Sequence, residues 1–177
     1  MKIIAITTAI TFAATSALAQ SAAESSGVNS LAGIPPKTQD FVTEAASSDM
    51  FEIESSKLAV ERGDDASKSF AQQMIQDHQK TADELKQLLA GGKVEATQPT
   101  TMTSAHKEML EELKGLKGAD FAEQYKSDQE DVHEDAVDLF TRYGEEGENA
   151  ELKAWAAKTA PALEHHLQMA EELNNNR

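Results

Sequence analysis

Apolar residues recur at helical spacing in four long stretches of this chain, and no stretch alternates apolar and polar residues in a sustained way. The first pattern predicts amphipathic helices, and the lack of the second leads us to expect no strands. Glycine, proline or polar runs bound each stretch, as is typical of helix ends. The predicted long helices cover residues 38–62, 64–90, 120–143 and 149–173, and a short helix covers residues 103–114.

The connections between the predicted helices indicate how the helices pack. Short connections join the first long helix to the second and the third to the fourth, so each pair is expected to form an antiparallel hairpin. The connection between the second and third long helices is longer and contains the short helix. Four amphipathic helices with one long crossover are typical of a ferritin-like bundle. We therefore expect an all-α, ferritin-like antiparallel four-helix bundle over residues 38–173, with a frayed tail over residues 174–177.

Single residues predict where these helices begin, end or bend. Thr38 has a side chain suited to the N-cap of the first helix, and Gly63 is expected to stop that helix. Gly144 and Gly147 are expected to stop the third long helix. Pro161 lies inside the last helix, where it removes one backbone hydrogen bond and is expected to bend the helix. A break into two helices at this proline is the alternative.

The N-terminal segment has the features of an export signal. Lys2 is followed by the apolar run 3–17, and an Ala-x-Ala sequence ends at Ala19. We expect cleavage after Ala19 and a periplasmic protein. A retained N-terminal anchor is the alternative, but the run is short for a membrane span, and the lack of cysteine excludes a lipoprotein. The Ser-, Ala- and Gly-rich residues 20–37 are expected to form a disordered leader.

Charge and cysteine content restrict the partners of the chain. The formal net charge is −15, and no basic patch is present to neutralise nucleic-acid phosphates. The same balance argues against electrostatic binding to anionic lipid and is compatible with attracting cations. With no cysteine, the chain has no disulfide, no thiolate metal site and no thiol nucleophile. We therefore expect no nucleic-acid partner and no membrane-spanning segment after cleavage, and the sequence defines no protein partner.

Three histidines fall inside the apolar stripes of three different predicted helices. These residues are His78, His133 and His166, whereas the neighbouring His165 points toward solvent. One histidine on an apolar face is usually a hydrogen-bonded core residue. Three histidines from helices that pack together predict a buried polar cluster, whose commonest chemical use is metal binding.

Glu52 is the expected fourth member of this cluster. It lies on the apolar arc of the first helix, whereas Glu54 and Glu61 point away from the core. A buried carboxylate is costly unless it has a cation or hydrogen-bond donors nearby. At about 1.5 Å per residue, all four residues lie near the middle of their helices. The predicted metal ligands are Glu52, His78, His133 and His166.

Each of these residues also has an interpretation without a metal. Each histidine alone fits a hydrogen-bonded core residue, and Glu52 could form a salt bridge with a protonated histidine. The methionines Met50, Met74, Met109 and Met169 fit packing better than copper binding. His106 fits a packing or capping role, with a role as an additional ligand as the alternative.

Three segments resemble the signature stretches of a secreted, ferritin-like bacterial family, domain of unknown function 4142. The segments are residues 49–53, 70–78 and 161–167, and the start of the third long helix and His133 also fit. The family has a Phe-Asp pair followed by a tyrosine, where this chain has Asp120-Phe121 and Tyr125. The resemblance covers residues 38–173. It implies a four-helix bundle exported to the periplasm or envelope, with the four predicted ligands at recurring polar core positions, but no defined activity.

The ligand set disfavours a di-iron carboxylate centre. Such a centre needs a Glu-x-x-His pair from each of two helices and two further glutamates. Glu130 and His133 form one pair, but Leu163 and Ala162 stand where the second pair needs a glutamate. Three imidazoles and one carboxylate suit zinc, copper, nickel or mononuclear iron. A closed four-ligand site would be structural, whereas three histidines with a distant glutamate would leave a position open.

The sequence shows no nucleophile elbow, phosphate-binding loop or supported Ser/His/Asp arrangement, so no catalytic residue is assigned. The favoured hypothesis is a periplasmic bundle that binds a divalent transition metal, in metal sequestration or envelope stress protection. The first alternative is a non-enzymatic interaction module with a buried His/Glu hydrogen-bond network. The second is a metal-dependent oxidase or peroxide-handling enzyme.

Overall fold

The computed structural model describes residue 30 and residues 32–175. This part of the chain forms five helices and no strand, so the all-α prediction is confirmed for it. The helices are α3 (Thr38–Arg62), α4 (Asp65–Ala90), α5 (Ser104–Gly115), α6 (Gly118–Glu146) and α7 (Ala150–Asn175). The predicted signal peptide, its cleavage site after Ala19 and most of the predicted leader lie outside the described residues. None of the described helices is both long and apolar enough to cross a membrane.

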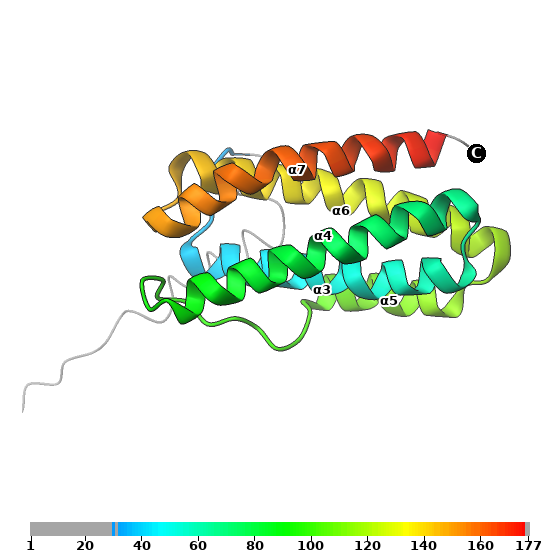
Figure 1. The fold of residues 1–177 in the computed structure, drawn as a ribbon, viewed down its shortest axis with the longest axis horizontal. Coiled ribbons are helices and arrows are strands. Elements are labelled where there is room, and N and C mark those ends of the chain that lie inside the picture. The colour runs from blue at the N-terminus through cyan, green and yellow to red at the C-terminus, as the bar shows by residue number, and fades with distance from the viewer. Residues whose placement is uncertain (1–29, 31, 176–177) are drawn as a thin grey trace, which may run out of the picture.

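The five helices form a helical bundle in which α3 and α4, and likewise α6 and α7, run antiparallel to each other (Figure 1). The closest helix pairs are α3 with α4 and α6 with α7, which are the two predicted hairpins. The hairpins meet through α3 against α6 and α4 against α7. Residues 91–103 and α5 carry the chain back along the molecule, from the end of α4 to the start of α6 (Figure 1). On the way, α5 packs against α3 and α6.

The predicted end of the third long helix is wrong. Gly144 does not stop α6, which continues to Glu146 and is capped by Gly147. A Cβ atom at Gly144 would lie 2.9 Å from the backbone nitrogen of Ala157, so this glycine allows α6 and α7 to approach closely. This close approach cannot be read from a local sequence pattern.

The start of α3 also differs from the prediction. Lys37 is the N-cap, and Thr38 is the first helical residue. The Thr38 backbone amide donates to Glu148 Oε1 at 3.0 Å, and its hydroxyl is 2.8 Å from the Tyr143 hydroxyl. Because Glu148 supplies the missing acceptor from the α6–α7 connection, the helix does not need a local capping side chain. The predicted stop of α3 at Gly63 is confirmed.

The last helix runs without interruption through Pro161. The alternative of two separate helices is therefore wrong. The helix also extends to Asn175, two residues beyond the predicted end, and its continuity places residues on both sides of the proline in one stripe.

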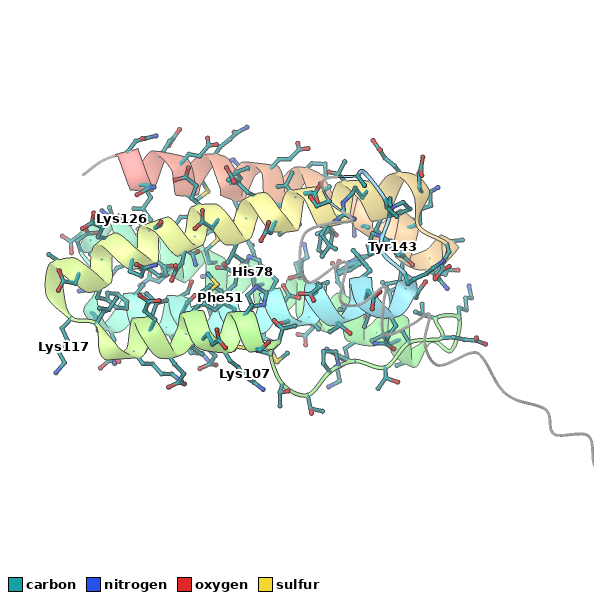
Figure 2. All side chains as sticks on the ribbon, turned by 180° about the vertical axis from the view of Figure 1, so that it is seen from behind. Phe51, His78, Lys107, Lys117, Lys126 and Tyr143 are labelled. Atoms are coloured by element: carbon teal, nitrogen blue, oxygen red, sulfur yellow. The ribbon has the colours of Figure 1, made fainter. Side chains whose placement is uncertain are left out.

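The apolar core consists of two clusters that lie toward opposite ends of the bundle. The first cluster contains Phe41, Leu85, Phe140, Tyr143 and Trp155, and the second contains Phe51, Phe70, Met74, Phe121 and Tyr125. Figure 2 shows His78 near mid-length, with Tyr143 toward one end and Lys117 at the other. Full burial of a leucine or phenylalanine side chain contributes about 1.5–3 kcal/mol, so the two clusters provide most of the driving force for folding.

A polar layer separates these two clusters. On each of three helices the core changes from one cluster to the other at a histidine. The core residues and the histidine between them are Met74, His78 and Leu85 on α4, Val132, His133 and Ala136 on α6, and Leu163, His166 and Ala170 on α7. On α3, buried polar residues that include Asp49 and Glu52 occupy the same layer. The layer interrupts an otherwise apolar interior, which requires a compensating interaction.

Candidate metal centre

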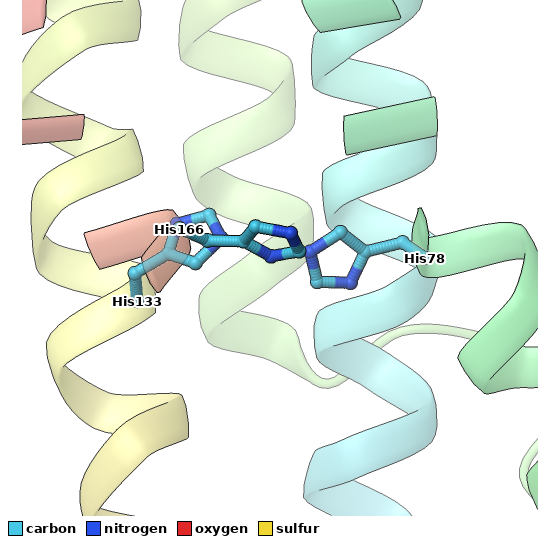
Figure 3. Close-up of side chains that lie close together, drawn as sticks. All are labelled: His78, His133 and His166. Carbon is cyan, nitrogen blue, oxygen red and sulfur yellow. The ribbon is translucent and has the colours of Figure 1, made fainter. Parts of the chain in front are cut away.

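The structure brings His78, His133 and His166 together inside the bundle, from α4, α6 and α7 (Figure 3). The three ring centroids are 5.6 Å apart in every pair. One ring nitrogen from each histidine lies within 4.8 Å of the other two. The residues are only 2%, 1% and 5% exposed, respectively. Three helices thus direct three imidazoles at one buried point.

Two of the rings are held from behind by acceptors on the far side of the ring. His78 Nδ1 donates to Asp49 Oδ1 of α3 at 2.9 Å, and the Thr81 hydroxyl donates to the same carboxylate oxygen at 2.7 Å. His133 Nδ1 donates to the backbone carbonyl of Gln129, one turn earlier in α6, at 2.7 Å. Because carboxylate and carbonyl oxygens are acceptors, each Nδ1 carries a proton, and in the neutral form of the ring each Nε2 keeps its lone pair.

The third ring is held in the opposite orientation by a residue that the sequence analysis did not assign. His166 Nε2 donates to Asp77 Oδ2 of α4 at 2.9 Å, which leaves the lone pair on Nδ1. Asp77 also accepts from Gln73 at 2.7 Å. Burial raises the pKa of Asp77, but the hydrogen bonds from Gln73 and His166 outweigh burial and lower it. The adjacent Asp77 and His78 were the signal available in the sequence, but Asp77 accepts its hydrogen bond from a histidine of another helix.

The remaining ring nitrogens are buried and have no hydrogen-bond partner among the described residues. They are His78 Nε2, His133 Nε2 and His166 Nδ1. An unpartnered buried polar atom costs about 1–3 kcal/mol, so three at one point require an explanation. In a hydrogen-bonded histidine network these nitrogens would pair with one another. Convergent lone pairs, each with its opposite N–H fixed by an acceptor, are instead the arrangement of histidines that bind a metal.

Glu52 lies in the same polar layer but outside the group of converging nitrogens. Its side chain is fully buried, and its Oε1 accepts from Gln129 Nε2 at 3.2 Å. The same oxygen is 4.0 Å from His133 Nδ1, the nitrogen on the outer side of that ring. The other oxygen, Oε2, is buried without a hydrogen-bond partner among the described residues. The group of ligand atoms within 4.8 Å of one another contains the histidines alone.

Two buried carboxyl groups, those of Asp49 and Glu52, lie in the polar layer. Burial raises the pKa of Glu52 to about 7, although the nearby charge of His78 opposes the shift. Burial also raises the pKa of Asp49, although the hydrogen bond with His78 opposes it. Among the described residues, no lysine or arginine forms an ion pair with either group. Two buried carboxyl groups without a lysine or arginine partner make the layer favourable for a cation.

The histidine pKa values keep at least two of the rings neutral. Burial, aided by the charge of His78, lowers the pKa of His133 to about 3. Burial likewise lowers the pKa of His166. Burial acts in the same direction at His78, but the hydrogen bond to Asp49 and the charges of Glu52 and Asp49 outweigh it and raise the pKa. Neutral imidazole is the form that binds metals, so His133 and His166 are ready ligands at neutral pH.

Other residues considered from the sequence lie away from this point. Glu130 Oε2 accepts from Asn174 Nδ2 at 2.5 Å, so its carboxylate is engaged with the end of α7. His106 Nδ1 is 2.6 Å from the Ser47 hydroxyl, and the ring stacks on Phe51 with centroids 5.5 Å apart. Burial lowers the pKa of His106 to about 4. His106 thus has the packing role, and Glu130 is not part of the histidine cluster.

Two smaller predictions about side-chain direction are confirmed. His165 is exposed, in contrast to the adjacent His166. Met74, Met109 and Met169 pack in or against the second apolar cluster, which is the packing role favoured by the sequence. The helical period alone predicts which of these side chains face the core and which face solvent.

Comparison with known proteins identifies the family. Residues 20–173 match the family described as Domain of unknown function (DUF4142). No curated protein and no solved structure matches the chain. The matched region includes all three converging histidines, Glu52 and both aspartates that support the rings. The chain therefore belongs to the DUF4142 family of domains of unknown function.

Proposed function

We propose that the protein is an exported, ferritin-like helical bundle whose His78, His133 and His166 bind one divalent transition-metal ion, with the Glu52 carboxylate in the same polar layer beside it. One observation carries the proposal. Three buried lone pairs converge, while the opposite nitrogen of every ring is already hydrogen-bonded to an acceptor. Such outer hydrogen bonds fix the tautomer and orientation of metal-binding histidines.

The donor atoms restrict the ion. Three imidazole nitrogens suit zinc, copper, nickel or iron, whereas magnesium and calcium prefer oxygen ligands. A divalent charge would also compensate the buried carboxylates of Glu52 and Asp49, which have no lysine or arginine partner among the described residues. Ligand type and charge therefore favour the same class of ion.

The ferritin-like arrangement and the location are part of the same proposal. The order of hairpin, long crossover and hairpin supports a ferritin-like topology, with α5 as an addition in the crossover. The signal-like residues 1–19 support export to the periplasm. In the envelope, the site would serve metal sequestration or stress protection.

The test is elemental analysis of the full chain, purified from the periplasm without chelator or histidine tag. We expect near-stoichiometric metal in the wild-type protein and none in the folded His78→Ala/His166→Ala variant. The matched control is His165→Ala, which removes the exposed neighbour of His166 and should keep the metal. A wild-type protein that holds no metal even after reconstitution with zinc, copper, nickel or ferrous ions would refute the proposal.

A further inference from the structure

We infer that the ion at this centre keeps one exchangeable water in its fourth coordination position, and that Glu52 and Gln129 hold this water. The inference rests on the proposed metal site and deepens it. It assigns Glu52 a place one water molecule away from the ion. It also makes the centre a binding site for small exogenous ligands, with small anions as the ligand class.

The first argument is the balance of donors and acceptors in the polar layer. Besides the three ring nitrogens, two oxygens of neighbouring residues are buried without a partner among the described residues. These are Glu52 Oε2 and Gln129 Oε1. The ion uses the nitrogen lone pairs, but the oxygens are acceptors that need hydrogen-bond donors. A water molecule on the ion carries two polarised O–H donors, so one bound water satisfies both oxygens.

The second argument is the position of Glu52. Its carboxylate is not a member of the group of atoms within 4.8 Å of one another. Its Oε1 lies 4.0 Å from His133 Nδ1, which already donates to the Gln129 carbonyl and lies on the outer side of the ring. A direct ligand would instead lie beside the inward nitrogens. The carboxylate is therefore placed to accept a hydrogen bond from a ligand of the ion.

The third argument is that the Gln129 amide has a fixed orientation. Its Nε2 donates to Glu52 Oε1 at 3.2 Å and lies 3.4 Å from the Ser55 hydroxyl. A carboxylate can only accept from the amide, so the nitrogen must face Glu52 and Oε1 must face elsewhere. Gln129 also lies one turn before His133, on the same face of α6. Gln129 and Glu52 are thus positioning residues that act on the water through hydrogen bonds.

The chemistry of such a centre follows from its open position. Closed sites with four protein ligands are structural, whereas three protein ligands with a bound water leave a position for exchange. The surrounding residues are nearly inaccessible, with Glu52 and Gln129 at 0% exposure. Only ligands of a few atoms can replace the water without opening the bundle, and azide is a suitable probe.

The test uses the full chain loaded with Co²⁺, whose visible absorption reports its ligands. We expect a four-coordinate spectrum that changes saturably with one azide per Co²⁺. In Glu52→Gln, which keeps the side-chain shape, Co²⁺ should still bind with a similar spectrum. Azide should bind about tenfold more tightly in this variant, because a negative charge near the anion is removed. The control Glu61→Gln changes an exposed carboxylate of the same helix and should behave as the wild type.

The possible results separate the two proposals. Co²⁺ binding without any azide response in the wild type overturns the open position and leaves the metal site standing. A Glu52→Gln spectrum that shows a lost ligand, with an azide response that only the variant has, also overturns it, because Glu52 would then coordinate directly. A wild-type protein that binds no Co²⁺ overturns the metal site, and the open position with it.

Discussion

At the scale of the residue, two of the three histidines of the centre depend on a partner from another helix. Asp77 directly precedes His78 in α4, yet it accepts a hydrogen bond from His166 of α7. His78 in turn donates to Asp49 of α3. The adjacent residues Asp77 and His78 thus belong to different hydrogen-bonded pairs, and the orientation of the His78 and His166 rings is set across helix interfaces.

Replacing Asp77 tests whether this outer support matters for the ion. Asp77→Ala removes the acceptor of His166 Nε2–H, so the ring can rotate or change its tautomer. Loss of such a partner typically weakens metal affinity about 10–100-fold. Competition with a chromophoric chelator measures the change. The control Asp83→Ala removes an exposed carboxylate of the same helix, and equal affinity in both variants would contradict the assigned role.

The raised pKa of Glu52 predicts how pH affects the metal-free protein. The group binds its proton up to pH about 7 in the folded state, but only up to its ordinary value of 4.5 when unfolded. The folded state therefore binds more protons between these values, and the Glu52 contribution to stability is lost as pH rises through this window.

Because other groups titrate in the same range, we expect this effect in a comparison of metal-free wild-type protein with Glu52→Gln. The two should have similar stability near pH 4.5. Near pH 8 the wild type should be less stable by up to about 3 kcal/mol, at 1.36 kcal/mol per pKa unit. Urea unfolding with chelator present measures the difference. Parallel stability curves over this range would contradict a raised pKa, and Glu61→Gln provides the baseline.

At the scale of the element, the contact of α6 with α7 positions two of the three histidines. Gly144 lies where the two helices approach, and an added Cβ would meet the backbone of Ala157 at 2.9 Å. Sequence periodicity cannot distinguish such a glycine from one that ends a helix. The Gly115 position at the end of α5 has open space around it and provides the contrast.

This contrast predicts opposite effects for the same substitution. Gly144→Ala should lower the free energy of unfolding by about 1–3 kcal/mol, because the clash is with backbone that cannot move alone. Gly115→Ala should leave stability unchanged or raise it by up to about 1 kcal/mol, because alanine restricts the unfolded chain. Urea unfolding measures both variants. A Gly144→Ala protein as stable as the wild type would show that the helices do not approach so closely.

At the scale of the whole molecule, the polar layer separates two apolar clusters that could otherwise form one continuous core. An ion in this layer would be held by three helices, and Glu52 and Asp49 of the fourth contact the same layer. Binding would therefore couple both hairpins. Such coupling would let a chain without disulfides gain stability from a ligand of the folded state.

The melting temperature should accordingly depend on metal. A free ion concentration of about 100 times the dissociation constant adds about 2.7 kcal/mol to the stability of the folded state. For a domain of this size, we expect the midpoint to rise by roughly 5–10 °C. Calorimetry with added ion and with chelator measures the rise. His165→Ala should show the same gain and His78→Ala/His166→Ala none, whereas a buried network without metal would give no gain in any of them.

The sequence by itself determined the helices and the face of each helix that is buried. The 3.6-residue period depends only on local geometry, so it separates His166 from His165 and Glu52 from Glu54 without knowledge of neighbouring helices. The family resemblance identified from short segments was likewise confirmed. The same local rules misplaced the stop at Gly144, because its neighbour across the interface belongs to another helix.

Only the tertiary structure decided which side chains meet. The pairing of Asp77 with His166 and of Asp49 with His78, and the position of Glu52 outside the three nitrogens, depend on how each helix is rotated and shifted against its neighbours. A shift of one residue moves a side chain by about 1.5 Å along the axis and 100° around it. Packing of the two apolar clusters fixes these rotations and shifts, and it involves residues far apart in the sequence.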